Sequence, residues 1–278
     1  PEAAFDYVRA HWKEESVAEH SEWLKIFPAS LCDDEVAFFQ EIYEELLRPA
    51  ALKKQANHAL RRTLVEMLLR CPTSEIFQTT VQALRPYLQR TKSSFVGPEK
   101  WKWTLPDHHD AFFKPEIMGS RYEIDPNPAH AKWTDAACWL IELTMLLHPV
   151  AWEQWTGAGW AKILPFLEEA GNDSQKWPLL QQLAQSIVAT RYRPAALAYT
   201  ERYVLTDVQA GMLHALTNEE LAAWWIKSPE LPPCAALRTV VQRPGWRWSL
   251  ALSRHVLKQL LQEQDIYQNA QCAFDWCI

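Results

Sequence analysis

Apolar residues recur about every three or four positions along most of this chain, which is the spacing of one face of an α-helix. After Asp33, a residue type that caps helices, Val36 and Phe39 begin such a stripe while glutamates occupy the other side. The same pattern predicts helices over residues 3–26, 33–47, 49–68, 73–88, 132–147, 174–190 and 249–264.

Two further helix starts are marked by their capping residues. Thr206 is followed three positions later by Gln209, and Thr217 by Glu220. This is the spacing at which a capping hydroxyl and a longer polar side chain satisfy each other's backbone amides. We therefore expect helices to begin at Thr206 and at Thr217.

Residues 91–131 interrupt the helical pattern. This stretch holds five of the 18 prolines and two of the seven glycines, so one continuous helix is excluded there. Its aromatic residues predict a packed, ordered excursion: Trp101, Trp103, Phe112, Phe113 and Tyr122. We expect it to separate an N-terminal helical segment, 1–90, from a C-terminal helical repeat segment, 132–278.

This succession of helices, without a visible strand pattern, predicts an all-α fold of irregular antiparallel helix pairs. The scarcity of glycine, seven residues in 278, argues against a β-barrel or sandwich, whose tight turns need positive φ angles. A HEAT-like α-solenoid is the favoured architecture, and an irregular helical bundle is the alternative because no fixed repeat length is visible.

The charge balance disfavours two classes of partner for the molecule as a whole. Thirty-four acidic residues against 28 basic ones give a formal net charge of −6, which repels nucleic acid and anionic lipid.

The longest apolar run, 136–147, contains Glu142 and is shorter than the roughly 20 residues of a membrane span. Because the chain starts at Pro1 and shows no apolar signal segment, we expect a trimmed chain or a fragment of a longer protein.

The cysteines indicate a reducing compartment. None belongs to a CxxC pair, and several occur in apolar helical stretches, as buried thiols of cytoplasmic proteins do. We expect all six to be reduced and the protein to be cytoplasmic: Cys32, Cys71, Cys138, Cys234, Cys272 and Cys277.

One set of residues suggests metal chemistry. Imidazoles and carboxylates bind zinc, iron or manganese, and all-helical metal phosphohydrolases of the HD type use a lone histidine, a His-Asp pair and a later aspartate. His58, the pair His109 and Asp110 (preceded by His108), and Asp173 or Asp207 occur in that order. Prolines bracket the pair closely, unlike the core helix of that fold, so the metal site is the alternative hypothesis.

A second set suggests a binding surface. Between Glu230 and Glu263 there is no acidic residue, and two tryptophans accompany five basic ones: Arg238, Arg243, Arg247, Arg254, Lys258, Trp246 and Trp248. Arginine forks onto carboxylates or phosphates, and exposed tryptophan anchors partners. An acidic protein segment is the favoured ligand and nucleic acid the lesser one. A solvated helix face and tryptophans packed in the core are the simpler explanations.

The segment 132–262 also resembles a known family. The resemblance is carried by AACWLIELTMLL running into HPVAWEQW, by WPLLQQLAQSIV, and by WRWSLALSRHVLKQLL. The matching positions are Pro149, Trp152, Glu153, Trp248, Ser249, Leu252, Ser253 and Arg254. They are similar to a bacterial helical-repeat family of unknown function encoded beside MoxR-type AAA+ ATPases, von Willebrand factor A proteins and SWIM zinc-finger proteins. The resemblance implies a helical repeat and supplies no catalytic residues.

Three functional hypotheses follow. The first is a non-enzymatic scaffold or adaptor that binds other proteins in a bacterial AAA+ ATPase-linked system. The second is a metal-dependent, HD-like phosphohydrolase, and the third a nucleic-acid-binding helical module. No glycine-rich phosphate loop or G-x-S-x-G motif is present, so we expect neither a cofactor nor nucleophilic catalysis.

Overall fold

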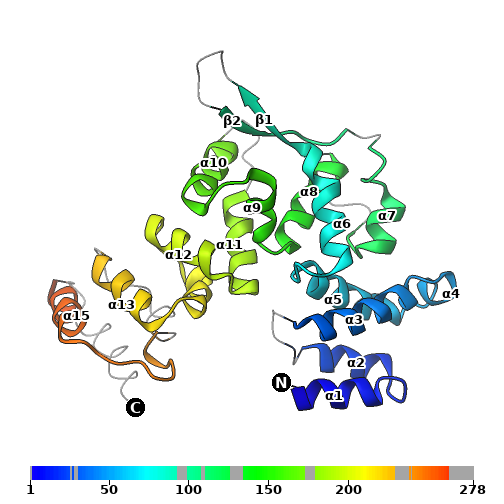
Figure 1. Ribbon diagram of the computed structural model, residues 1–278, viewed down its shortest axis with the longest axis horizontal. Helices are drawn as coiled ribbons and strands as arrows, with labels where there is room; N and C mark the ends of the chain where they lie inside the picture. The colour runs from blue at the N-terminus through cyan, green and yellow to red at the C-terminus, as the bar shows by residue number, and fades with distance from the viewer. Residues whose placement is uncertain are drawn as a thin grey trace. The chain divides into compact units, whose positions relative to one another are not determined.

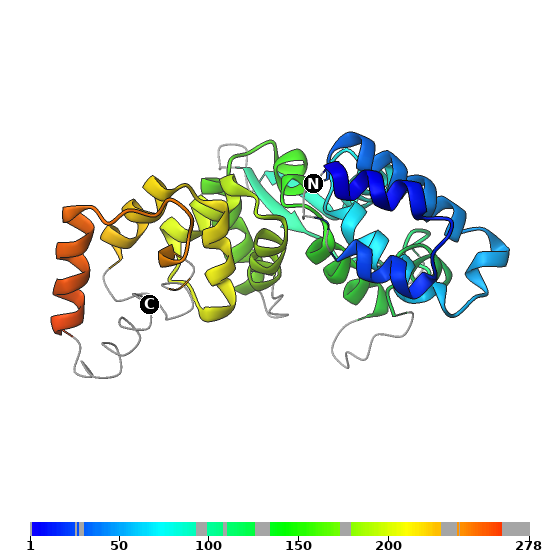
Figure 2. The same cartoon turned by 90° about the horizontal axis from the view of Figure 1, so that it is seen from below.

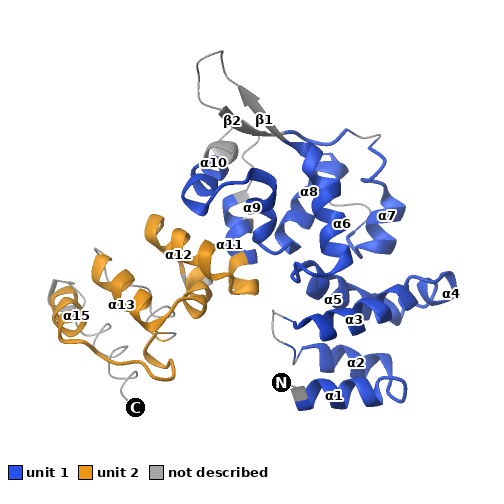
Figure 3. Ribbon diagram, in the orientation of Figure 1, with its two compact units in different colours: residues 1–186 blue, residues 187–278 orange. Residues whose placement is uncertain are grey.

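The computed structural model is dominated by helices, which confirms the predicted all-α class (Figures 1 and 2). It describes residues 2–25, 27, 31–92, 99–107, 110–125, 134–172, 179–228, 238 and 240–262. The chain divides into two compact units, unit 1 (Pro1–Ser186) and unit 2 (Ile187–Ile278), coloured blue and orange in Figure 3.

Unit 1 is built around helix α5, which contacts α2, α3, α4 and α6. Its elements are α1 (Glu2–His11), α2 (Val17–Leu24), α3 (Asp33–Leu46), α4 (Pro49–Leu52), α5 (Asn57–Leu69), α6 (Glu75–Leu84), the 3-10 helix η1 (Arg85–Tyr87), β1 (Leu88–Lys92), β2 (Glu99–Trp103), α7 (Pro115–Arg121), α8 (Asp135–Leu146), α9 (Val150–Thr156), α10 (Trp160–Asn172) and the first part of α11 (Leu179–Thr190). Leu64, Leu68 and Phe77 are fully buried and mark its core.

Two tryptophan side chains fasten the second half of unit 1 to the first. Trp155 of α9 donates its indole N–H to the carbonyl of Val81 in α6 at 2.9 Å. Trp139 of α8 donates to the carbonyl of Asp125 at 2.8 Å. Both tryptophans are buried in the helical core of unit 1.

The division of the chain differs from the expected one. We expected residues 91–131 to separate two helical halves, whereas the boundary between the two compact units falls after Ser186 in the sequence, inside α11. The described part of the excursion packs within unit 1: Tyr122 and Phe113 are almost fully buried, and the Tyr122 hydroxyl lies 2.9 Å from that of Thr80. Proline there stops helices without stopping the chain from packing.

The expectation of no strands is wrong in one place. β1 and β2 form a two-stranded antiparallel sheet in which Leu88 pairs with Trp103 and Lys92 with Glu99. The amide of Thr104 extends the pairing by donating to Tyr87 O at 2.7 Å. Strand pairing depends on a partner segment and not on a local stripe, which explains why the helical reading missed it.

Unit 2 is a smaller set of helices. Its elements are the last residues of α11, α12 (Arg193–Arg202), the 3-10 helix η2 (Asp207–Ala215), α13 (Asn218–Lys227) and α15 (Leu250–Gln262). Helix α12 contacts η2 and α13, and α13 contacts α15. Several helices contact a neighbour in sequence, as α5 does with α6, and α5 also contacts the more distant α2 and α3. The finer choice of a HEAT-like solenoid over a bundle stays a prediction.

Helix starts were predicted more accurately than helix continuity. The boxes at Thr206 and Thr217 are both formed, with Glu220 N donating to Thr217 Oγ1 at 3.2 Å. The helix predicted over 73–88 is capped by Ser74, whose hydroxyl accepts from Phe77 N at 3.1 Å. The segments 3–26 and 49–68 are each split into two helices. No described helix is both long and apolar enough to cross a membrane.

Candidate functional site

Helix α15 packs one side against the rest of unit 2 and exposes the other side to solvent. Ser249 caps its start, accepting from Leu252 N at 3.1 Å. Leu252 and Val256 are buried, and Gln259 donates to Ser228 O at the end of α13 at 2.9 Å. The indole N–H of Trp225 donates to Gln259 Oε1 at 3.3 Å. These contacts fix the orientation of the helix relative to α13.

The tryptophans of this region divide between core and surface. Trp225 is fully buried, and its ring centroid lies 5.5 Å from that of Trp248. Trp248 in turn lies 6.2 Å from Trp246 and is 44% exposed. The core explanation therefore holds for Trp225, while Trp248 offers part of an indole to solvent beside α15.

The arginines expected to bind a partner are not equivalent. Arg238, Arg247 and Arg254 are exposed and form no ion pair with the residues that the structure describes. Arg243 is half-buried and donates from Nη1 to Leu213 O at 3.3 Å, so it serves the fold of unit 2. Burial, followed by the positive charges of Arg191 and Arg243, lowers the pKa of His214.

Two exposed leucines of this surface were missed by sequence reasoning. Leu250 is 68% exposed and Leu257 is 59% exposed. Leu252 and Val256, on the other side of this helix, are buried. The seven-residue spacing between Leu250 and Leu257 was a signal for a second, outward-facing stripe.

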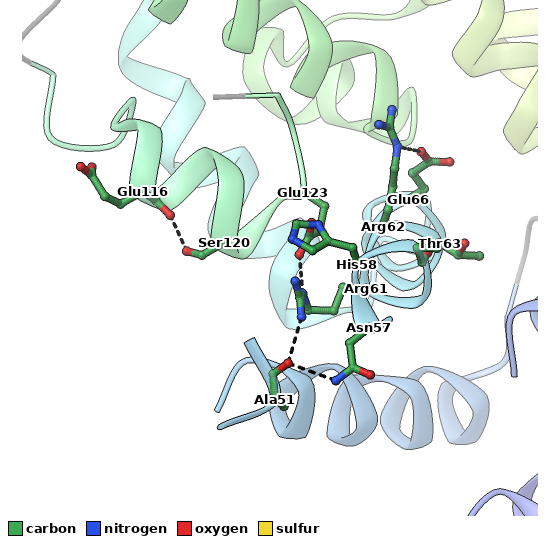
Figure 4. Close-up of polar contacts among 11 residues, drawn as sticks. Ala51, Asn57, His58, Arg61, Arg62, Thr63, Glu66, Glu116, Ser120 and Glu123 are labelled. Atoms are coloured by element: carbon green, nitrogen blue, oxygen red, sulfur yellow. Dashed lines mark hydrogen bonds and ion pairs between the residues drawn. The ribbon is translucent and has the colours of Figure 1, made fainter. Parts of the chain in front are cut away.

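The first residue of the alternative metal set has other partners. Nδ1 of His58 contacts Glu123 Oε2, and Arg61 Nε contacts Glu123 Oε1 (Figure 4). The side chains of Arg61 and Glu123 are 1% and 3% exposed, whereas that of His58 is 57% exposed. Glu123 adopts a left-handed backbone conformation, with φ 52°, that turns its carboxylate toward α5. This arrangement neutralises a buried guanidinium.

Asp110, the second member of that set, also serves a structural contact. Its Oδ2 accepts a hydrogen bond from the Tyr87 hydroxyl, and its Oδ1 accepts one from Phe112 N at 2.9 Å. His108, His109 and Asp173 lie outside the described residues, and Asp207 begins η2. Within the described part of the chain, no group of three or more His, Cys, Asp or Glu side chains could hold a metal ion.

The described thiols are unpaired. Cys71 and Cys138 are buried, Cys32 is exposed, and all three are free. Burial raises the pKa of the Cys71 and Cys138 thiols, which keeps them protonated and unreactive. Cys234, Cys272 and Cys277 lie outside the described residues.

Comparison with known proteins places this helical chain in a family. No match was found among curated proteins or among solved structures. A family model matches residues 1–275, which extends the similarity well beyond the segment 132–262 on which the sequence resemblance rested. The chain therefore belongs to the family of unknown function DUF5691.

Proposed function

We propose that this protein is a non-enzymatic helical-repeat scaffold or adaptor that binds an acidic segment of another protein through unit 2. The observation that carries the proposal is the pair Arg247 and Arg254, both exposed and without an ion-pair partner in the described part of the chain. Exposed arginines without an ion-pair partner add little to the stability of the fold. Arginine and tryptophan are, however, enriched where proteins bind one another.

Electrostatics on the scale of the molecule support the same partner. The chain carries a formal net charge of −6, whereas the described residues 238–262 contain no acidic side chain. An acidic partner would be steered to this one surface and repelled by the rest. Arginine can then form bidentate hydrogen bonds with the partner's carboxylates, which also fix the orientation of the partner.

The cellular setting is proposed from the sequence resemblance. The family that segment 132–262 resembles is encoded beside MoxR-type AAA+ ATPases, so we propose a component of such a bacterial system as the partner. The unpaired thiols Cys32, Cys71 and Cys138 support a cytoplasmic location, where thiols stay reduced.

The test is a charge reversal at the two exposed arginines. A chain carrying Arg247→Glu and Arg254→Glu should lose affinity for the proteins that co-purify with the unaltered chain, and its residual binding should be less sensitive to salt. Arg243 is left unchanged because it bonds within the fold. Lys114→Glu with Lys162→Glu, at exposed positions in unit 1, is the matched control with the same change in charge.

Other outcomes favour the alternative functions. Unchanged affinity and salt dependence in the folded arginine variant would refute the proposed surface. Elemental analysis that finds about one transition metal per chain would favour the phosphohydrolase centred on His58, His109 and Asp110. Displacement of the protein partner by single-stranded oligonucleotide would favour the nucleic-acid-binding module.

A further inference from the structure

The outward side of α15 carries an apolar stripe. Leu250 and Leu257 are seven residues apart, two helical turns or about 10 Å, and so project to the same side. Leu252, Val256 and Gln259 are buried and occupy the opposite side, against α13. Figures 1 and 2 both place α15 at the edge of unit 2. The stripe therefore has no cover among the described residues of unit 2.

The charged side chains beside this stripe are all positive among the residues that the structure describes. Arg254 lies between the two leucines on the helix surface, Lys258 follows Leu257, and Arg247 precedes the helix start; all three are exposed. An apolar stripe flanked by cations matches an apolar stripe flanked by carboxylates, as at the edges of coiled coils. The stripe therefore favours an acidic helix, and not just any acidic segment, as the part of the partner that binds here.

A second copy of the chain fits this face poorly. In a two-fold antiparallel pairing, each Leu250 would meet the other copy's Leu257, so the axis would pass beside Arg254. The two Arg254 side chains would then face each other without a carboxylate, which is unfavourable. Nucleic acid fits poorly as well, because two exposed leucines gain nothing beside phosphates. An anionic membrane would be repelled by the net charge of −6.

We propose that the outward side of α15 binds an amphipathic α-helix of another protein, with its apolar residues against Leu250 and Leu257 and its carboxylates on Arg254, Lys258 and Arg247. The inference rests on the proposed scaffold function and specifies the partner element. The seven-residue spacing matches the heptad of a second helix, which is the recognition mode in which one helix lies along another.

The binding test uses two synthetic helical peptides of about 20 residues, a length at which isolated helices become stable. Both carry the same leucine stripe, one with flanking glutamates and the other with flanking lysines. Fluorescence anisotropy with the full chain should show binding of the glutamate peptide, weakened by salt, and little binding of the lysine peptide. Equal binding of both peptides, or of neither, would overturn the inference.

Substitutions then separate the two contributions. Leu250→Ser with Leu257→Ser should weaken the glutamate peptide by about tenfold or more. Val204→Ser, at an apolar residue of unit 2 that is 77% exposed, is the matched control and should change nothing. Arg254→Glu with Lys258→Glu should exchange the preference so that the lysine peptide binds better. Loss of the glutamate peptide without that exchange would leave only general charge attraction and would contradict a paired helix.

A photo-crosslinking residue at position 257 of the full chain identifies the occupant in cells. We expect the linked peptide to come from another protein and to combine acidic residues with a helical apolar period. A link to a second copy, to lipid, or to residues 263–278 of the same chain, which include Glu263, Asp265 and Asp275, would refute the inference. If arginine reversal releases the cellular partner but the leucine variants do not, the scaffold stands and the helix inference fails. If neither releases it, both fail.

Discussion

The buried pair Arg61 and Glu123 gives the sharpest prediction about stability. Replacing Glu123 by Gln keeps the shape of the side chain and removes its charge. The Arg61 guanidinium, 1% exposed, would then keep only neutral acceptors: the amide oxygen of the new side chain and the carbonyl of Ala51 at 3.4 Å. Removing one member of a buried ion pair costs about 3–5 kcal/mol, because the other charge stays buried without compensation.

Two companion variants isolate the cause. Arg61→Met with Glu123→Gln removes the buried charge itself, so the double variant should be more stable than Glu123→Gln alone by about 2 kcal/mol. His58→Ala removes the other contact of Glu123, but that side chain is 57% exposed, so the loss should stay below about 1 kcal/mol.

The assay is urea unfolding followed by far-UV circular dichroism, with the free energy of unfolding taken from the midpoint at constant denaturant dependence. Because the chain has two compact units, hydrogen exchange of α5 amides should confirm that the loss lies in unit 1. A Glu123→Gln variant within about 0.5 kcal/mol of the unaltered chain would show that water solvates Arg61, and would refute the reasoning.

Three further predictions concern single contacts. Burial lowers the pKa of His148 from 6.5 to about 4, so an unfolded chain takes up a proton below pH 6.5 that the folded chain excludes. The free energy of unfolding should be constant above pH 6.5 and fall by up to about 3 kcal/mol as the pH approaches 4. In urea unfolding at a series of pH values, His148→Asn should make this dependence weaker. A Cβ at Gly211 would lie 2.7 Å from Val188 Cγ1, so Gly211→Ala should lower the thermal midpoint of unit 2, and adding Val188→Ala should restore most of it. Gly157 ends α9 with φ 61° and open space around it, so Gly157→Ala should cost about 1 kcal/mol in urea unfolding through backbone strain alone.

Local sequence determined the helices and their starts. The boxes at Thr206 and Thr217 form as their spacing predicts, because a cap needs only residues three positions apart. The same locality explains why the helical class and the acid-free window of unit 2 were visible without coordinates. It also explains the errors, since α1 and α2 are separated by residues 12–16, where neither a proline nor a glycine marks the end of a helix.

Tertiary structure decided which side chains are available. His58 and Glu123 are 65 positions apart, so no local spacing in the sequence predicts that they lie in contact. The hypothesis that His58 binds a metal therefore missed its contact with Glu123. Arg243 and Arg247 look alike in the sequence, but only the first lies beside a carbonyl of η2. Leu250 and Leu252 are both apolar residues of α15, and the position of α13 buries one and exposes the other. Helix formation depends on neighbours along the chain, whereas burial and pairing depend on neighbours in space.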